Sequence, residues 1–268
     1  MAHLPHPPLP GRRRLLAAAL LGLLGPGLAA PTRADTLPDL VERAKPAVLL
    51  VGSFGLLDSP RFGFRGTGFV VGDGRQAITN AHVLPPPAAP GAPERRLVVQ
   101  LWAGGQQWSQ REARVAALDT AHDLALLSFD GPPAPALKLA EGGPPREGSD
   151  IALIGFPLGG ALGFSHVTHR GILAARTSIA LPAPASQALN ARAVAQLRQG
   201  SFEVLQLDIT AYPGNSGGPV FDLASGAVVG IVSMVLVKGT HESVLSAPSG
   251  ISYAMPVEHA RALLGPRP

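Results

Sequence analysis

Short apolar runs alternate with Gly- and Pro-rich turns along most of this chain. Runs such as AVLLVGSF, GTGFVV and FEVLQLDI have the length and the β-branched content of strands. Many short strands separated by turn residues are typical of sandwiches and barrels, so the pattern predicts an all-β fold. The predicted strands cover residues 47–54, 66–71, 76–81, 96–102, 112–118, 124–129, 150–156, 166–175, 202–209, 218–223, 227–237 and 250–257.

Helical spacing of apolar residues marks both ends of this β pattern. It predicts a short helix over residues 36–44, ended by Pro46, and a closing helix over residues 257–264, followed by Gly265. Two segments interrupt the strands: residues 84–95, LPPPAAPGAPER, predict an exposed, stiff loop, and residues 188–198 allow one or two helical turns.

Residues 1–34 have the layout of an export signal. Arg12, Arg13 and Arg14 precede a short apolar run and then small residues that end at Ala34, after which we expect cleavage. The arginines allow the Sec or the twin-arginine route, to the periplasm or the exterior. An uncleaved membrane anchor is the alternative, but the run is shorter than the roughly 20 residues that a spanning helix needs. Residues 35–268 would then form one domain.

The charge balance changes once this signal is set aside. The segment holds four arginines and no acidic residue, so 22 basic against 18 acidic residues become 18 against 18. The sequence therefore predicts no nucleic-acid partner. The chain contains no cysteine, so its stability has to come from a packed core without disulfides.

The stretch AYPGNSGGPVFD places Ser216 between Asn215 and Gly217, in residues that also build ordinary turns. A serine nucleophile needs a base, because its hydroxyl is weakly nucleophilic on its own. His82 stands at the end of a predicted strand in ITNAHVL, where it can face a cleft. The structural alternative is a half-buried turn histidine bonded to a carbonyl.

A serine and histidine pair also needs a buried acid that orients the imidazole. Asp123 directly precedes the apolar run LALLSF, whereas Asp119 lies in the turn before it, so we prefer Asp123 and expect His122 to point into solvent. Asp123 could instead only cap backbone amides. The order His82, Asp123, Ser216 is that of the chymotrypsin-like arrangement. Gly214 can adopt a conformation that aims its amide and that of Ser216 at one point, an oxyanion hole.

Seven segments together resemble the protease domain of HtrA-type (Deg-type) trypsin-like serine proteases, across roughly residues 37–264. They are GTGFVV, ITNAHVL, DLALL, HVTHRGILAAR, LDITAYPGNSGGPVFD, GAVVGIVS and ISYAMPV. The resemblance implies two packed six-stranded β-barrels of the chymotrypsin/trypsin type with short N- and C-terminal helices. It also implies His82 as general base, Asp123 as its orienting acid, Ser216 as nucleophile, and the backbone of Gly214, Asn215 and Ser216 around the oxyanion.

The same resemblance implies an exported serine endopeptidase, of the periplasmic protein quality control type, that hydrolyses unfolded or misfolded polypeptides without a cofactor or metal. Two alternatives stay open, a non-catalytic chaperone or binding protein on a protease fold, and an esterase. Family members often form trimers, so the resemblance allows a homo-oligomer.

The sequence departs from the family pattern at three places. The chain ends at Pro268, so we expect no PDZ-mediated partner in cis. The loop over residues 180–200 is long and rich in Ala and Pro. Asn215 stands where digestive enzymes have an aspartate that pairs with a new N-terminus, so we expect no activation by such an ion pair.

The residues around the expected substrate pocket are uncharged. The nearest acid is Asp208, which strand alternation from Thr210 would put on the same face but deeper. A pocket without a carboxylate predicts cleavage after small or medium aliphatic residues. The walls are expected to be Thr210, Ala211, Ser233, Met234 and Val235.

Overall fold

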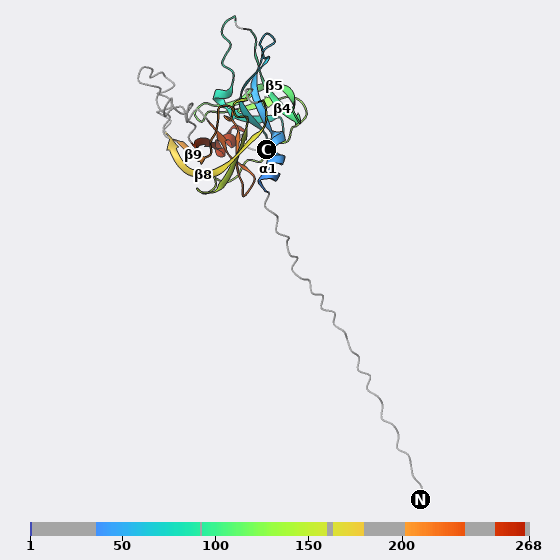
Figure 1. Cartoon of the computed structure of the whole chain (residues 1–268), viewed down its shortest axis with the longest axis vertical. Helices are drawn as coiled ribbons and strands as arrows, with labels where there is room; N and C mark the ends of the chain where they lie inside the picture. Colours follow the sequence, from blue (N-terminus) through green and yellow to red (C-terminus); the bar gives the residue numbers. More distant parts are fainter. Residues whose placement is uncertain (2–35, 92, 160–162, 180–201, 234–249, 266–268) are drawn as a thin grey trace. The chain divides into compact units, whose positions relative to one another are not determined.

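The computed structural model describes residues 1, 36–91, 93–159, 163–179, 202–233 and 250–265 of the chain. Residues 36–265 of this set lie in one compact unit, Ala34–Pro268 (Figure 1). The expected signal over residues 1–34 and the helical turns over residues 188–198 lie outside the described residues. None of the described helices is long and apolar enough to span a membrane.

Six antiparallel strands close into an N-terminal barrel in the order β1-β2-β3-β6-β5-β4. The inward faces of these strands are aliphatic, with Leu49, Val51, Val70 and Leu127 fully buried, and their burial drives closure of the barrel. The strands are β1 (Val48–Phe54), β2 (Phe62–Val71), β3 (Gln76–Asn80), β4 (Arg96–Gly104), β5 (Gln107–Asp119) and β6 (Leu124–Phe129).

A second closed barrel follows in the order β10-β11-β12-β9-β8-β7. Its longest strand, β8, pairs with β7 on one side and β9 on the other, and β8 and β9 run side by side in Figure 1. The strands are β7 (Asp150–Gly155), β8 (Val167–Ile179), β9 (Phe202–Asp208), β10 (Pro219–Asp222), β11 (Val228–Val232) and β12 (Ile251–Pro256). The predicted double-barrel fold of trypsin-like type is confirmed. Each described strand overlaps a predicted one, but β2 begins four residues and β5 five residues before the predicted runs.

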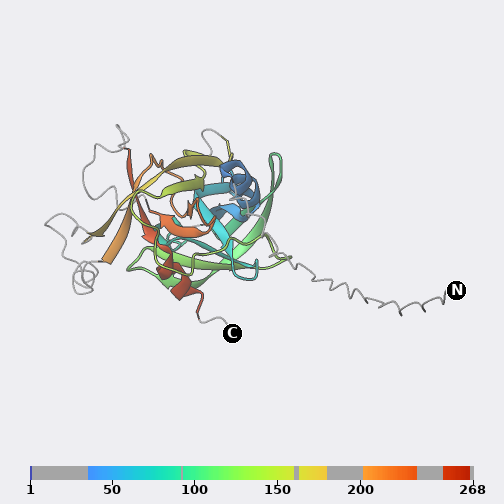
Figure 2. The same ribbon diagram turned by 90° about the horizontal axis from the view of Figure 1, so that it is seen from below.

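Within the described residues, two short α-helices flank the barrels. Helix α1 (Leu37–Ala44) begins at a capping box in which Thr36 and Asp39 satisfy each other's backbone amides, and it buries Leu40 and Ala44. It continues into the 3-10 helix η1 (Lys45–Ala47), which leads into β1. Helix α4 (Val257–Leu263) follows β12 without a break and packs against β6 of the N-terminal barrel (Figure 2). The closing helix thus ties the end of one barrel to the other.

The two barrels also share a buried apolar layer. Phe69 and Ile78 of the first barrel belong to the same packed cluster as Ile154, Phe156 and Phe221 of the second. Burying each such side chain contributes about 1.5–3 kcal/mol, so this layer resists sliding of one barrel against the other. The described residues of the Pro-rich segment, 85–91 and 93–95, are mostly exposed, as predicted.

Candidate active site

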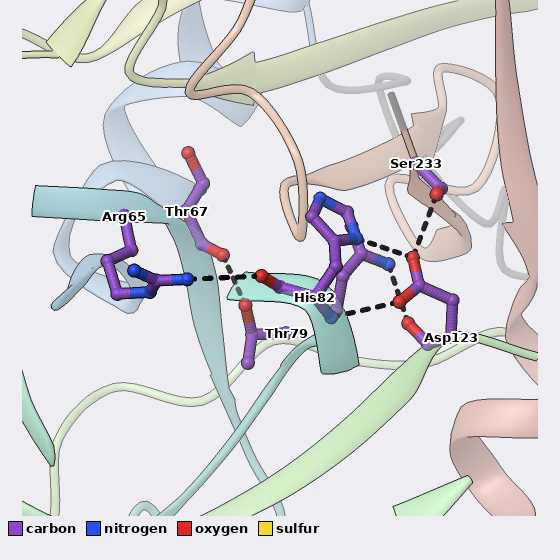
Figure 3. Close-up of polar contacts among 7 residues, drawn as sticks. Arg65, Thr67, Thr79, His82, Asp123 and Ser233 are labelled. Atoms are coloured by element: carbon purple, nitrogen blue, oxygen red, sulfur yellow. Dashed lines mark hydrogen bonds and ion pairs between the residues drawn. The ribbon is translucent and has the colours of Figure 1, made fainter. Parts of the chain in front are cut away.

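His82 lies where the first barrel meets the second. It belongs to the 3-10 helix η2 (Ala81–Val83), which directly follows β3. Its ring atom Nδ1 lies 2.7 Å from Asp123 Oδ2, and its backbone N–H donates to Asp123 Oδ1 at 3.0 Å (Figure 3). Arg65 of β2 anchors the turn by donating from Nε to Val83 O at 2.6 Å. His82 is thus fixed by its backbone as well as by its side chain.

Asp123 is held in an uncommon backbone conformation. Its φ is 55°, in the left-handed region that a residue other than glycine adopts only when its surroundings enforce it. Its carbonyl accepts from Ala81 N at 2.9 Å and from Asn80 Nδ2 at 3.0 Å, which joins the start of β6 to the end of β3. This backbone geometry directs the carboxylate at His82.

Ser233, at the end of β11, provides a third hydrogen bond to this carboxylate. Its Oγ donates to Asp123 Oδ2 at 3.0 Å, and its side chain is completely buried. The sequence predicted Ser233 as a wall of the substrate pocket, and its bond to the acid was missed. Three donors therefore converge on Asp123 and offset the cost of partly burying its charge.

Asp119 has a separate role within its own turn. Its carboxylate accepts from the backbone amides of Ala121 and His122 at 3.1 Å and lies 2.6 Å from His122 Nδ1. Although burial acts to raise it, these hydrogen bonds hold the pKa of Asp119 below its usual value. His122 does not point into solvent as expected, because its ring stacks on His259 of α4 at a centroid distance of 3.7 Å. Asp123, and not Asp119, faces His82.

Ser216 lies in the loop over residues 212–218, here called the nucleophile loop, which leads into β10. Ser216 is buried, with 5% of its surface exposed, and its carbonyl accepts from Thr67 N at 2.9 Å. A Cβ added at Gly66 would lie 2.7 Å from Val83 Cγ2 and 3.0 Å from Ser216 O. The segment of the second barrel that carries Ser216 therefore packs against the same stretch of β2 as the turn that carries His82.

Gly214 has a conformation and a setting that only glycine fits. Its φ is 101°, and an added Cβ would lie 2.3 Å from Phe156 O. The preceding carbonyl, Pro213 O, accepts from Leu158 N at 2.7 Å. Because the C=O and N–H of a trans peptide point in opposite directions, the Gly214 N–H is directed away from Leu158. The orientation of the Gly214 N–H is therefore set by the hydrogen bond between Pro213 O and Leu158 N.

Asn215 contributes differently from the expectation for the oxyanion region. Its backbone N–H donates to Tyr212 O at 3.0 Å and is therefore engaged within the loop. Its side chain is completely buried, so an uncharged amide there avoids the cost of an unpaired carboxylate. The Asn215 N–H is therefore already bonded to Tyr212 O, and the oxyanion roles of Gly214 and Ser216 stay predictions.

The described part of the predicted pocket is neutral. Thr210 is half-buried, and Ala211 is buried with its amide bonded to Ser252 Oγ at 3.0 Å. Asp208 is exposed, so the expectation that it lies deeper on the face of Thr210 is wrong. It is the last residue of β9, and strand alternation does not continue beyond it. Met234 and Val235 lie outside the described residues.

Several known proteins are similar to this chain in sequence. The sequence model of the trypsin-like peptidase domain matches residues 66–231. The chain is 30% identical to a probable periplasmic serine endoprotease DegP-like of Pseudomonas fluorescens, over 73% of this chain and 33% of the relative. A protein of the same name from Halomonas elongata is also 30% identical over the same shares.

A solved structure supports the fold. The serine endoprotease from Yersinia pestis aligns with a TM-score of 0.58 and 24% identity, over 86% of this chain and 65% of that one. The chain spans about a third of the length of the curated relatives that it matches. The resemblance to HtrA/Deg-type protease domains is confirmed at the level of the domain.

Proposed function

Since the chain belongs to the trypsin-like peptidase family, we propose that it is a serine endopeptidase that works through an acyl-enzyme on Ser216. The observation that carries the proposal is the His82–Asp123 pair, with Nδ1 and Oδ2 2.7 Å apart at the junction of the barrels. The ring Nδ1 and the backbone N–H of His82 both bond to the Asp123 carboxylate. A half-buried turn histidine would not need this double attachment.

The first chemical step transfers one proton and forms one bond. His82 Nε2 takes the proton of the Ser216 hydroxyl while Oγ bonds to the carbonyl carbon of the substrate, whose C=O pair moves to oxygen. Asp123 accepts a hydrogen bond from the Nδ1–H of His82 and stabilises the imidazolium that forms. The imidazolium then gives its proton to the leaving amine as the peptide C–N bond breaks. Water repeats the sequence on the acyl-enzyme.

The negative oxygen of each tetrahedral intermediate is stabilised by the amides of Gly214 and Ser216. The orientation of the Pro213–Gly214 peptide supports this role, because its carbonyl is bonded to Leu158. Preorganised amides act strongly because they need no rearrangement when the charge develops.

The proposed substrates are unfolded or misfolded polypeptides, cleaved after aliphatic residues. The neutral setting of Thr210 and Ala211 supports an apolar specificity, because a buried cation would lack a partner there. The DegP-like relatives are described as periplasmic, which together with residues 1–34 supports export. A trimer belongs to the same proposal.

The test compares the wild type with Ser216→Ala. We expect a fluorophosphonate to label only the wild type, and casein turnover to fall by several orders of magnitude in the variant with an unchanged melting temperature. If Ser216→Ala retained more than a few per cent of wild-type activity, Ser216 would not be the nucleophile. Labelling with turnover of esters but not casein would indicate an esterase, and absence of labelling would indicate a binding protein.

A further inference from the structure

Thr67 of β2 contacts the nucleophile loop through its backbone and its side chain. It is completely buried. Its N–H donates to Ser216 O at 2.9 Å, and its Oγ1 donates to Gly214 O at 2.6 Å. The carbonyls on either side of Asn215 are therefore both held by one residue of the other barrel.

The Thr67 hydroxyl takes part in two hydrogen bonds, one as acceptor and one as donor. The Phe156 N–H, just after β7, donates to Thr67 Oγ1 at 3.2 Å, so the hydroxyl hydrogen is left for Gly214 O. A valine of the same shape would leave Phe156 N–H and Gly214 O without these partners. Buried, unpaired backbone groups are costly, so the loop would rearrange to recover them.

Gly214 is the residue at which such a rearrangement would be easiest. A glycine has few steric barriers to rotation about φ and ψ. The Gly214–Asn215 peptide is held by Thr67 Oγ1 at its carbonyl and by Tyr212 O at its N–H. Loss of the first bond removes half of that restraint, so this peptide would rotate and shift the Ser216 N–H that follows it relative to the Gly214 N–H, which stays held through Pro213 O and Leu158 N.

The two glycines that lie against Thr67, Gly155 and Gly217, have little space for a side chain. A Cβ added at Gly155 would lie 3.2 Å from Thr67 Oγ1, and one added at Gly217 would lie 2.1 Å from Thr67 O. Thr79 Oγ1 donates to that same carbonyl at 2.7 Å (Figure 3). Thr67 is thus closely enclosed by groups from both barrels.

We propose that Thr67 is a positioning residue of the oxyanion hole, whose hydroxyl holds the Gly214 carbonyl so that the amides of Gly214 and Ser216 converge. The inference rests on the proposed function, since an oxyanion forms only if Ser216 Oγ adds to a substrate carbonyl. Thr67 touches no reacting atom and acts through the nucleophile loop.

The test uses Thr67→Val, which removes the hydroxyl and keeps the shape, with Thr67→Ser as the rescue. Loss of one oxyanion donor costs about 10²–10³ in kcat, so loss of a residue that orients one should lower kcat about 10- to 100-fold with KM unchanged. Affinity for a peptide boronic acid, which bonds to Ser216 Oγ and places a charged oxygen in the hole, should fall in proportion. Thr67→Ser should restore both.

Thr79→Val is the matched control, because it removes a buried hydroxyl of the same network that donates to Thr67 O and not to a carbonyl of the nucleophile loop. We expect its kcat within about threefold of the wild type. A Thr67→Val enzyme with wild-type kcat, a change in KM alone, or an equal loss in Thr79→Val would overturn the inference. If Thr67→Val does not fold, Thr67→Ala replaces it, and failure of both to fold would assign the hydroxyl to stability instead.

Wild-type turnover is measured first and separates the two ideas. An inactive wild type that fluorophosphonate does not label contradicts the proposed function, and the role of Thr67 falls with it. An active wild type with an unaffected Thr67→Val variant contradicts only the positioning role.

Discussion

Replacing Asp123 with asparagine tests the geometry of the acid most directly. Oδ2 receives His82 Nδ1 and Ser233 Oγ, and Oδ1 receives the His82 backbone N–H. A carboxamide has one oxygen and one NH₂ group, so in either orientation its NH₂ meets a donor. If the NH₂ replaces Oδ2, His82 must present an unprotonated Nδ1. Its proton then lies on Nε2, which can no longer accept the proton of Ser216.

The expected cost follows from that tautomer. In a serine protease triad the same change lowers kcat by about 10⁴, which corresponds to about 5 kcal/mol of transition-state stabilisation. The folded state should lose less, because the asparagine amide keeps one oxygen acceptor, its NH₂ can donate to an unprotonated Nδ1, and the charge that is lost is partly exposed to solvent. We therefore expect a protein that melts cooperatively and is nearly inactive.

Asp119→Asn is the control, because its carboxylate also accepts two amides and a histidine ring but does not contact His82. kcat on casein and on a fluorogenic peptide is measured for both variants, with melting curves by circular dichroism. Asp119→Asn should keep kcat within a few-fold of the wild type. Equal activities of the two variants, or an Asp123→Asn enzyme above about a tenth of wild type, would refute the reasoning.

Three further outcomes are expected. Gly214→Ala should lower kcat about 10²–10³-fold, measured beside Gly104→Ala, which has a similar φ of 104° but no atom within 4 Å; equal kcat in both would contradict a special role of Gly214. Burial lowers the pKa of His166 and His259, so the unfolded chain binds protons before the folded protein does as pH falls through about 6.5. The urea midpoint of unfolding should therefore drop from pH 7.5 to pH 5.5. If the urea midpoint of His166→Gln falls with pH as steeply as that of the wild type, His166 does not contribute to the drop. Fragments of an unfolded substrate should end mainly in Val, Ala or Leu, and a majority of ends in Arg or Lys would show that an acid reaches the pocket.

Local pattern was enough to predict most of each described strand and which aspartate faces His82. The apolar run after Asp123 marks the start of a buried strand, and an acid at that point needs partners. Asp119, in a turn, satisfies itself locally through the amides that follow it. Both assignments depend on neighbours within a few residues.

Such local patterns do not predict contacts between segments that are far apart in the sequence. His122 was expected in solvent, but α4 returns from the end of the chain and places His259 on its ring. Ser233 is 110 residues from Asp123 in sequence, and the hydroxyl of Thr67 reaches a carbonyl 147 residues away. No local spacing encodes these partners, because each depends on how the two closed barrels pack.

These long contacts run in both directions across the barrel junction. His82 and Asp123 belong to the first barrel, yet Ser233 of the second barrel donates to the carboxylate. The nucleophile loop belongs to the second barrel, yet Thr67 of the first holds two of its carbonyls. Each half of the site is therefore oriented by a hydroxyl from the opposite barrel. A small shift of one barrel would loosen the Asp123 carboxylate and the nucleophile loop together, so under the proposed mechanism the buried layer between the barrels would bear on catalysis as well as on stability.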